Sequence, residues 1–128
     1  MVFKINQPFA SERKLSQSLV QVIELLSMYN AELARILGLQ CGDIGELTSG
    51  KSCIKKGSEA WHQAVLFINT YHLLYDYFDG DSVAMYHWMR ADNKNLQGTP
   101  HFLIVDDGKL QLVHDYLEQA FNSKVTEK

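Results

Sequence analysis

Apolar residues at helical spacing are the feature that most restricts the fold of this chain. Large apolar side chains recur every three or four residues in most segments between residues 14 and 122, and the whole of 58 to 91 follows this period. A parallel sheet would require strands that alternate with such helices. The chain has 128 residues, of which 46% are hydrophobic, so it can bury one ordinary core. We therefore predict an all-α fold.

Residues that cap helices set the predicted helix boundaries. Asn30, Ser58 and either Asp81 or Ser82 can accept the free N–H groups of a helix start, and Gly38 can end a helix in a left-handed conformation. Together with the spacing, these caps predict helices over 14–28, 31–37, 41–48 and 58–78, a fifth helix that begins after Asp81 or Ser82 and ends before a polar loop over 92–98, and a last helix over 109–122.

The run FLIVDD, from Phe102 to Asp107, cannot be assigned by its period, because a short apolar run fits a helix or a buried strand. The preceding Thr99-Pro100 places a capping hydroxyl before the proline that is favoured at the first helical position. This order favours a short helix. A strand is the alternative, since Ile104 and Val105 have high strand propensity.

The helix predicted over 58–78 is apolar on nearly all sides. Phe67 and Leu74 lie away from its main apolar stripe, so the helix is either central to the core or shared with another chain. The predicted stripe consists of Trp61, Ala64, Val65, Ile68, Tyr71, Tyr75 and Phe78.

The stretch GELTSGKS, from Gly45 to Ser52, matches the pattern G-x-x-x-x-G-K-[ST] of a phosphate-binding P-loop. FLIVDD would then be the strand whose acidic end holds magnesium. A P-loop requires a buried strand before the glycine-rich turn and a helix after it. Residues 38–44 contain only two large aliphatic side chains, and Gly57 interrupts the segment that follows. The context argues against a nucleotide site.

A helix-turn-helix explains the same residues better. With Asn30 as its first position, Ala34 stands where the two helices cross and a small residue is needed, and Gly38 stands at the turn. An αα-hairpin without a role in DNA binding is the alternative, since it needs the same packing residues. The apolar wedge between the helices would consist of Leu39, Ile44 and Leu47.

Charge differs between the two parts of the chain. Residues 1–57 carry seven Lys or Arg and five Asp or Glu, whereas 58–128 carry five and ten. A nucleic-acid contact therefore belongs to the first part and a basic partner to the second. The exposed positions of the recognition helix include two acids and two glycines but no Lys or Arg. The predicted DNA-binding residues are Gln40, Cys41, Asp43, Lys51, Lys55 and Lys56.

The sequence predicts no cofactor and no metal site. The five histidines lack the i,i+4 pairing of a metalloprotease helix, and the spacing of Cys41 and Cys53 indicates free thiols in a reducing compartment. No run is long enough to span a membrane, and the N-terminus lacks a signal peptide. We expect a cytoplasmic protein that is not an enzyme.

Between residues 67 and 119, the sequence resembles the toxin-binding domain of the Xre/MbcA/ParS-like antitoxins at a series of positions that mark this domain. In that family an Xre-like helix-turn-helix usually precedes this domain, and AELARILG followed by SGK resembles it in the expected order. The resemblance implies a helix-turn-helix region over 1–57 and a helical toxin-binding domain over 58–128. The marked positions are Phe78, Gly80-Asp81, Trp88, Arg90, Asn93, Leu96, Gly98, Pro100, Val113 and Tyr116-Leu117.

The resemblance also implies a function. Such a protein would be the antitoxin of a type II toxin-antitoxin system, a homodimer that neutralises a RES-domain toxin, which depletes NAD, and that represses its own operon by binding operator DNA. A stand-alone helix-turn-helix transcription regulator is the alternative. The implied toxin-binding residues are Trp88, Arg90, Asn93, Leu96, Gly98, Pro100, Tyr116 and Leu117, with the last two and the C-terminal tail near the toxin's NAD pocket.

Overall fold

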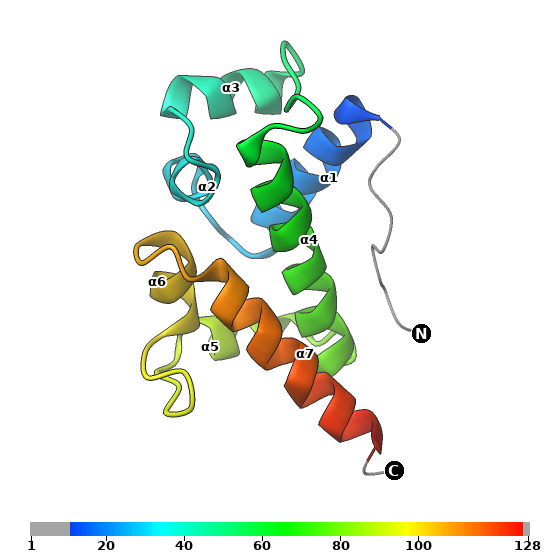
Figure 1. The fold of residues 1–128 in the computed structure, drawn as a ribbon, viewed down its shortest axis with the longest axis vertical. Helices are drawn as coiled ribbons and strands as arrows, with labels where there is room; N and C mark the ends of the chain where they lie inside the picture. Colours follow the sequence, from blue (N-terminus) through cyan, green and yellow to red (C-terminus); the bar gives the residue numbers. More distant parts are fainter. Residues whose placement is uncertain (1–10, 127–128) are drawn as a thin grey trace. The chain divides into compact units, whose positions relative to one another are not determined.

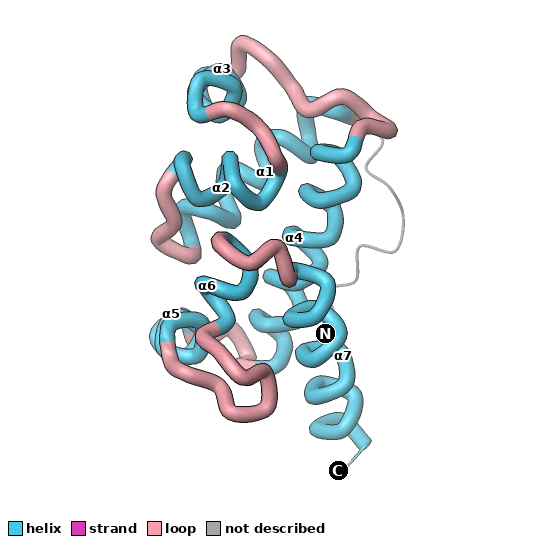
Figure 2. The backbone as a smooth tube through the Cα atoms, turned by 60° about the vertical axis from the view of Figure 1, so that its left-hand side comes forward, coloured by secondary structure: helices cyan, strands magenta, loops and turns pink. Residues whose placement is uncertain are grey.

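Seven α-helices make up the part of the chain that the computed structural model describes, residues 11 to 126 (Figure 1). Within these residues the backbone contains helices and loops but no strand, so the predicted all-α fold is confirmed (Figure 2). None of these helices combines the length and apolar character that would let it cross a membrane. The helices are α1 (Glu12–Leu25), α2 (Asn30–Leu37), α3 (Cys41–Ser49), α4 (Glu59–Tyr77), α5 (Ser82–Arg90), α6 (Pro100–Val105) and α7 (Leu110–Thr126).

The chain divides into two compact units, of which the described parts are 11–68 and 69–126. The division falls inside α4, so the first half of this helix belongs to one unit and the second half to the other. The domain boundary expected near Gly57 stays a prediction.

The first unit is built on α1, α2 and α3. Leu15, Leu19, Leu33 and Ile44 are completely buried in its core. Gly38 ends α2 with a φ of 70°, as predicted. The predicted cap of this helix was wrong by one residue. Tyr29 is the N-cap, because Glu32 reaches back and its carboxylate accepts the Tyr29 backbone N–H at 2.9 Å.

Two hydrogen bonds fix the loop between α3 and α4 against the start of α1. The hydroxyl of Ser16 accepts the backbone N–H of Ile54 at 3.0 Å, and the carboxylate of Glu12 accepts that of Lys56 at 2.6 Å. The loop ends where the Ser58 hydroxyl accepts the Trp61 N–H at 3.1 Å, which confirms Ser58 as a helix cap.

The buried row of α4 differs from the predicted stripe. Phe67 and Leu74 are each only 1% exposed, although the spacing placed them away from the stripe. Tyr75, which was placed on it, is 39% exposed. Because α4 is apolar on nearly all sides, its period does not decide which row is covered, and tyrosine can keep its hydroxyl in water.

The second unit contains α5, α6, α7 and the end of α4. Asp79 and Gly80 end α4 with φ values of 52° and 79°, and the carboxylate of Asp81 accepts the Ala84 N–H to start α5. FLIVDD forms α6 and the turn after it, with Pro100 at the helix start, so the helix was the correct assignment. The core of this unit includes Met85, Met89, Leu103, Ile104, Val105, Leu110, Val113 and Leu117.

Candidate functional site

The loop between α5 and α6 is a compact turn closed at Asn93 and Gly98. The N–H of Asn93 donates to the Gly98 carbonyl at 2.9 Å, and the N–H of Gly98 donates back at 3.2 Å. Inside the turn, the side-chain oxygen of Asn93 accepts the N–H groups of Asn95 and Leu96 at 3.0 and 3.1 Å. Asn93 therefore shapes the loop through both its backbone and its side chain.

Three of the predicted binding residues around this loop are packing residues. Leu96 is 7% exposed, and Pro100 is buried at the start of α6. A Cβ atom on Gly98 would lie 3.2 Å from the Cδ2 atom of the buried Leu103, so only glycine fits without a shift. These residues hold the loop against the rest of the second unit, and they offer little surface to a binding partner.

Two half-buried aromatic residues connect the loop to the helices on either side. Trp88 on α5 stacks on Tyr116 of α7, with ring centroids 6.4 Å apart and an interplanar angle of 18°. The amide nitrogen of Asn95 donates to the Tyr116 hydroxyl at 3.1 Å. The structure thus brings Trp88, Tyr116 and the loop together. Leu117, beside Tyr116 in sequence, is 1% exposed and belongs to the core.

Arg90 lies on a different side of α5. Its guanidinium carbon is 4.2 Å from the centroid of the Tyr86 ring, a cation–π contact. Tyr86 is 43% exposed and Val83, one helical turn earlier, is 64% exposed. Sequence analysis did not single out these two residues. The signal was the spacing of 83, 86 and 90, which places all three in one row of α5, separate from the row of Met85 and Met89.

The surface of α7 carries a small polar cluster. His114 and Gln111 hydrogen-bond to the carboxylate of Asp115, at 3.1 and 2.9 Å, and these bonds lower the pKa of that carboxyl below its usual range. Ligand atoms of His114, Asp115 and Glu118 lie within 4.8 Å of one another. The hydrogen bond between His114 and Asp115 accounts for the closeness of these two residues, and both acids are exposed.

The predicted DNA-binding residues lie on α3 and the loop after it, and all six are exposed. Gln40 is the N-cap of α3, and the carboxylate of Asp43 accepts the Gln40 N–H at 3.0 Å. One of the two acids on this helix therefore has a structural role in starting it. Arg13 shares a small cavity of about 220 Å³ with Gly50 and Ser52, so the first turn of α1 lies near the lysine-bearing loop.

The position of GELTSGKS excludes a P-loop. Residues 45–49 form the second half of α3, and Gly50 ends the helix with a φ of 81°. The motif therefore lies at a helix C-terminus, where the helix dipole repels phosphate, and no strand precedes it among the described residues.

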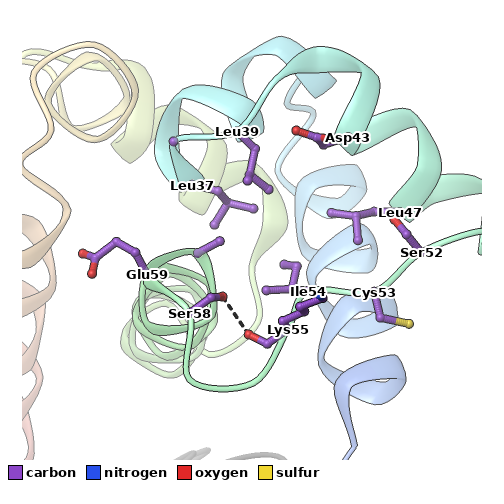
Figure 3. A pocket seen from close by; sticks show the side chains of 12 residues that line it. Leu37, Leu39, Asp43, Leu47, Ser52, Cys53, Ile54, Lys55, Ser58 and Glu59 are labelled. Atoms are coloured by element: carbon purple, nitrogen blue, oxygen red, sulfur yellow. Dashed lines mark hydrogen bonds between the residues drawn. The ribbon is translucent and has the colours of Figure 1, made fainter.

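An apolar groove of about 490 Å³ lies in the first unit between the end of α2, α3 and the loop before α4 (Figure 3). Leu37, Leu39, Leu47 and Ile54 are among the side chains that line it. Asp43 and Glu59 are also in its lining, and the Ser58 hydroxyl donates to the Lys55 carbonyl at 2.6 Å beside it.

Comparison with known proteins gives a match that lies in the second unit. No curated protein shows a significant match to the chain. Residues 73–121 match the family model described as the antitoxin Xre/MbcA/ParS C-terminal toxin-binding domain. The matched range contains the loop, α5, α6 and all eight residues that the resemblance had marked for toxin binding. Over residues 73–121 the chain is therefore similar to antitoxin Xre/MbcA/ParS C-terminal toxin-binding domains.

Proposed function

We propose that this chain is the antitoxin of a type II toxin-antitoxin system and that it neutralises a RES-domain toxin, which degrades NAD. The match over residues 73–121 carries the proposal, because the domain it describes binds toxins. The net charge of −5 over 58–128 supports a partner with a basic surface. We expect the protein to act in the cytoplasm as a homodimer.

Co-expression tests this function. The proposed function requires a RES-domain protein encoded beside the gene of this chain. That protein is produced with and without the chain, and growth and cellular NAD are measured. We expect the chain to restore both and to co-purify with the toxin. The variant Lys51→Glu with Lys55→Glu should restore them equally, since both lysines lie in the other unit. Continued NAD loss and the lack of a complex would refute the proposal.

We propose operator binding by the first unit as a second activity. The helix pair α2 and α3 supports it, because Ala34 is buried at 4% exposure, Gly38 is left-handed and Ile44 is completely buried, as a helix-turn-helix requires. The first turn of α1 and the loop after α3 supply cations for phosphate: Arg13, Lys14, Lys51, Lys55 and Lys56.

Gel retardation with the chain's own promoter tests this activity. Binding should weaken steeply with salt and be lost in the Lys51→Glu, Lys55→Glu variant. Asp43→Asn keeps a side-chain oxygen for the Gln40 N–H while removing a negative charge, so it should tighten DNA binding. No retardation at low salt would refute DNA binding and the alternative of a stand-alone regulator, whereas toxin neutralisation would be unaffected.

A further inference from the structure

The outer face of α5, which we define as Val83, Tyr86 and Arg90, is a candidate contact surface. Val83 is 64% exposed and Tyr86 43% exposed, so neither contributes much to the core. A separate row of the helix, Met85 and Met89, is buried, at 3% exposure each. The helix is therefore anchored through its methionines, while Val83 and Tyr86 are exposed and the half-buried Arg90 lies against the Tyr86 ring.

The contact between Arg90 and Tyr86 arranges this face in advance. With its guanidinium carbon 4.2 Å from the ring centroid, Arg90 restricts the ring of Tyr86, and the ring restricts Arg90. Side chains that are already ordered lose less entropy when a partner binds. Tyrosine and arginine are also enriched among the residues that contribute most to protein interfaces.

Most of the residues that mark the family cannot supply the surface that contacts a partner. Leu96, Pro100 and Leu117 are buried, and Asn93 uses its side-chain oxygen inside the loop. Trp88 is half-buried and stacks on a ring of the same unit.

A domain that binds a folded protein must offer exposed side chains. Within the matched range Tyr75, Phe102 and Leu112 are also exposed, but they lie on three separate helices. Val83 and Tyr86, in contrast, lie one turn apart on α5.

Charge indicates the chemistry of the partner. Asp81 is the N-cap of α5 and Asp92 follows its last turn, and both are exposed. The nine residues of α5 span about 14 Å, so an exposed acidic residue lies near each end of the helix, and the Arg90 guanidinium between them lies against the Tyr86 ring. A complementary surface is an apolar depression with lysine or arginine at its rim.

We propose that the outer face of α5 contacts the toxin, and that it fits an apolar, basic-rimmed depression on the toxin surface. The inference rests on the proposed antitoxin function and names the part of the domain that carries it out.

Affinity measurement with the purified RES-domain protein tests the inference. The full chain with Val83→Asn and Tyr86→Asn should bind the toxin at least about tenfold more weakly than the wild type. The matched control is Leu25→Asn with Tyr29→Asn, which removes an equally exposed aliphatic side chain and a tyrosine from the other unit, at 63% and 76% exposure. The control should bind within twofold of the wild type, and thermal unfolding should show that both variants are folded.

A second pair of substitutions tests the charged rim. Asp81→Asn with Asp92→Asn removes both charges, and asparagine can still cap α5. Association with the toxin should slow about tenfold at low salt and become less dependent on salt.

The outcomes separate the inference from the proposed function. Unchanged affinity in the Val83→Asn, Tyr86→Asn variant would overturn the inference while leaving the antitoxin function intact. If the wild type does not bind the RES-domain protein at all, the proposed function fails and the inference fails with it.

Discussion

Replacement of Asn93 by alanine tests whether this residue shapes the loop or contacts the partner. Alanine removes the acceptor of two hydrogen bonds, from the N–H groups of Asn95 and Leu96. A hydrogen bond contributes about 0.5–1.5 kcal/mol, and a buried donor left without an acceptor costs about 1–3 kcal/mol. The Asn95 N–H is exposed and can bond water, whereas that of Leu96 is partly buried. We therefore expect a loss of about 1–2 kcal/mol in the free energy of unfolding.

Urea unfolding followed by circular dichroism measures this loss. With an m value of about 1–3 kcal/mol/M, the midpoint should fall by roughly 0.3–2 M in urea. Asn93→Asp is the matched control, because aspartate keeps a side-chain oxygen at the same position. It should retain stability to within about 0.5 kcal/mol.

Toxin affinity in the same two variants separates the two roles. If Asn93 acts by shaping the loop, Asn93→Ala weakens binding and Asn93→Asp does not. A direct contact through the amide nitrogen would instead weaken both equally, because both lack that donor. Equal loss of affinity in the two variants, with no loss of stability in Asn93→Ala, would refute the structural role.

Three further predictions follow from single residues. Gly80→Ala should cost about 1–2 kcal/mol of stability, measured in urea, since φ is 79° there; no loss would contradict the left-handed backbone. Gly45→Ala should instead stabilise by about 0.5–1 kcal/mol, because Gly45 lies inside α3 with nothing within 4 Å of a new Cβ atom. Bonds from His114 and Gln111 lower the pKa of Asp115, so its contribution to stability is present above the ordinary value of 3.8 and is lost as the pH falls below it. An NMR titration of Gln111→Ala should show this pKa rising.

Much of the fold could be predicted because local chemistry sets the helix boundaries. Ser58 and Asp81 accept free backbone N–H groups at helix starts, and Gly38 adopts the left-handed conformation that ends a helix. These roles depend on residue type and not on tertiary packing, and the structure shows each residue in its predicted role. The N-cap of α2 was missed because tyrosine is a poor capping residue by type. At that position, the cap depends on a carboxylate three residues later, at Glu32.

The buried face of a helix is harder to predict when nearly every face is apolar. For α4 the spacing was compatible with several rows of side chains as the buried face. Only the packing of the folded chain determines that Phe67 and Leu74 are buried. The same limit applies to the candidate site. Val83 and Tyr86 are ordinary apolar residues in the sequence, and they become notable only because the structure leaves them in water.

The residues that identify this domain and the residues that we propose for partner contact therefore share only Arg90, and the two sets meet different physical demands. Asn93 and Gly98 meet backbone requirements, and Leu96 fills space beneath the loop, so any chain with this fold needs similar side chains there. Val83 and Tyr86 on the outer face of α5 meet no such requirement, because both are exposed and many side chains would be tolerated there. A surface that is free to vary can be matched to one particular toxin. Exchange of Val83 and Tyr86 should accordingly change which toxin is bound without changing the fold.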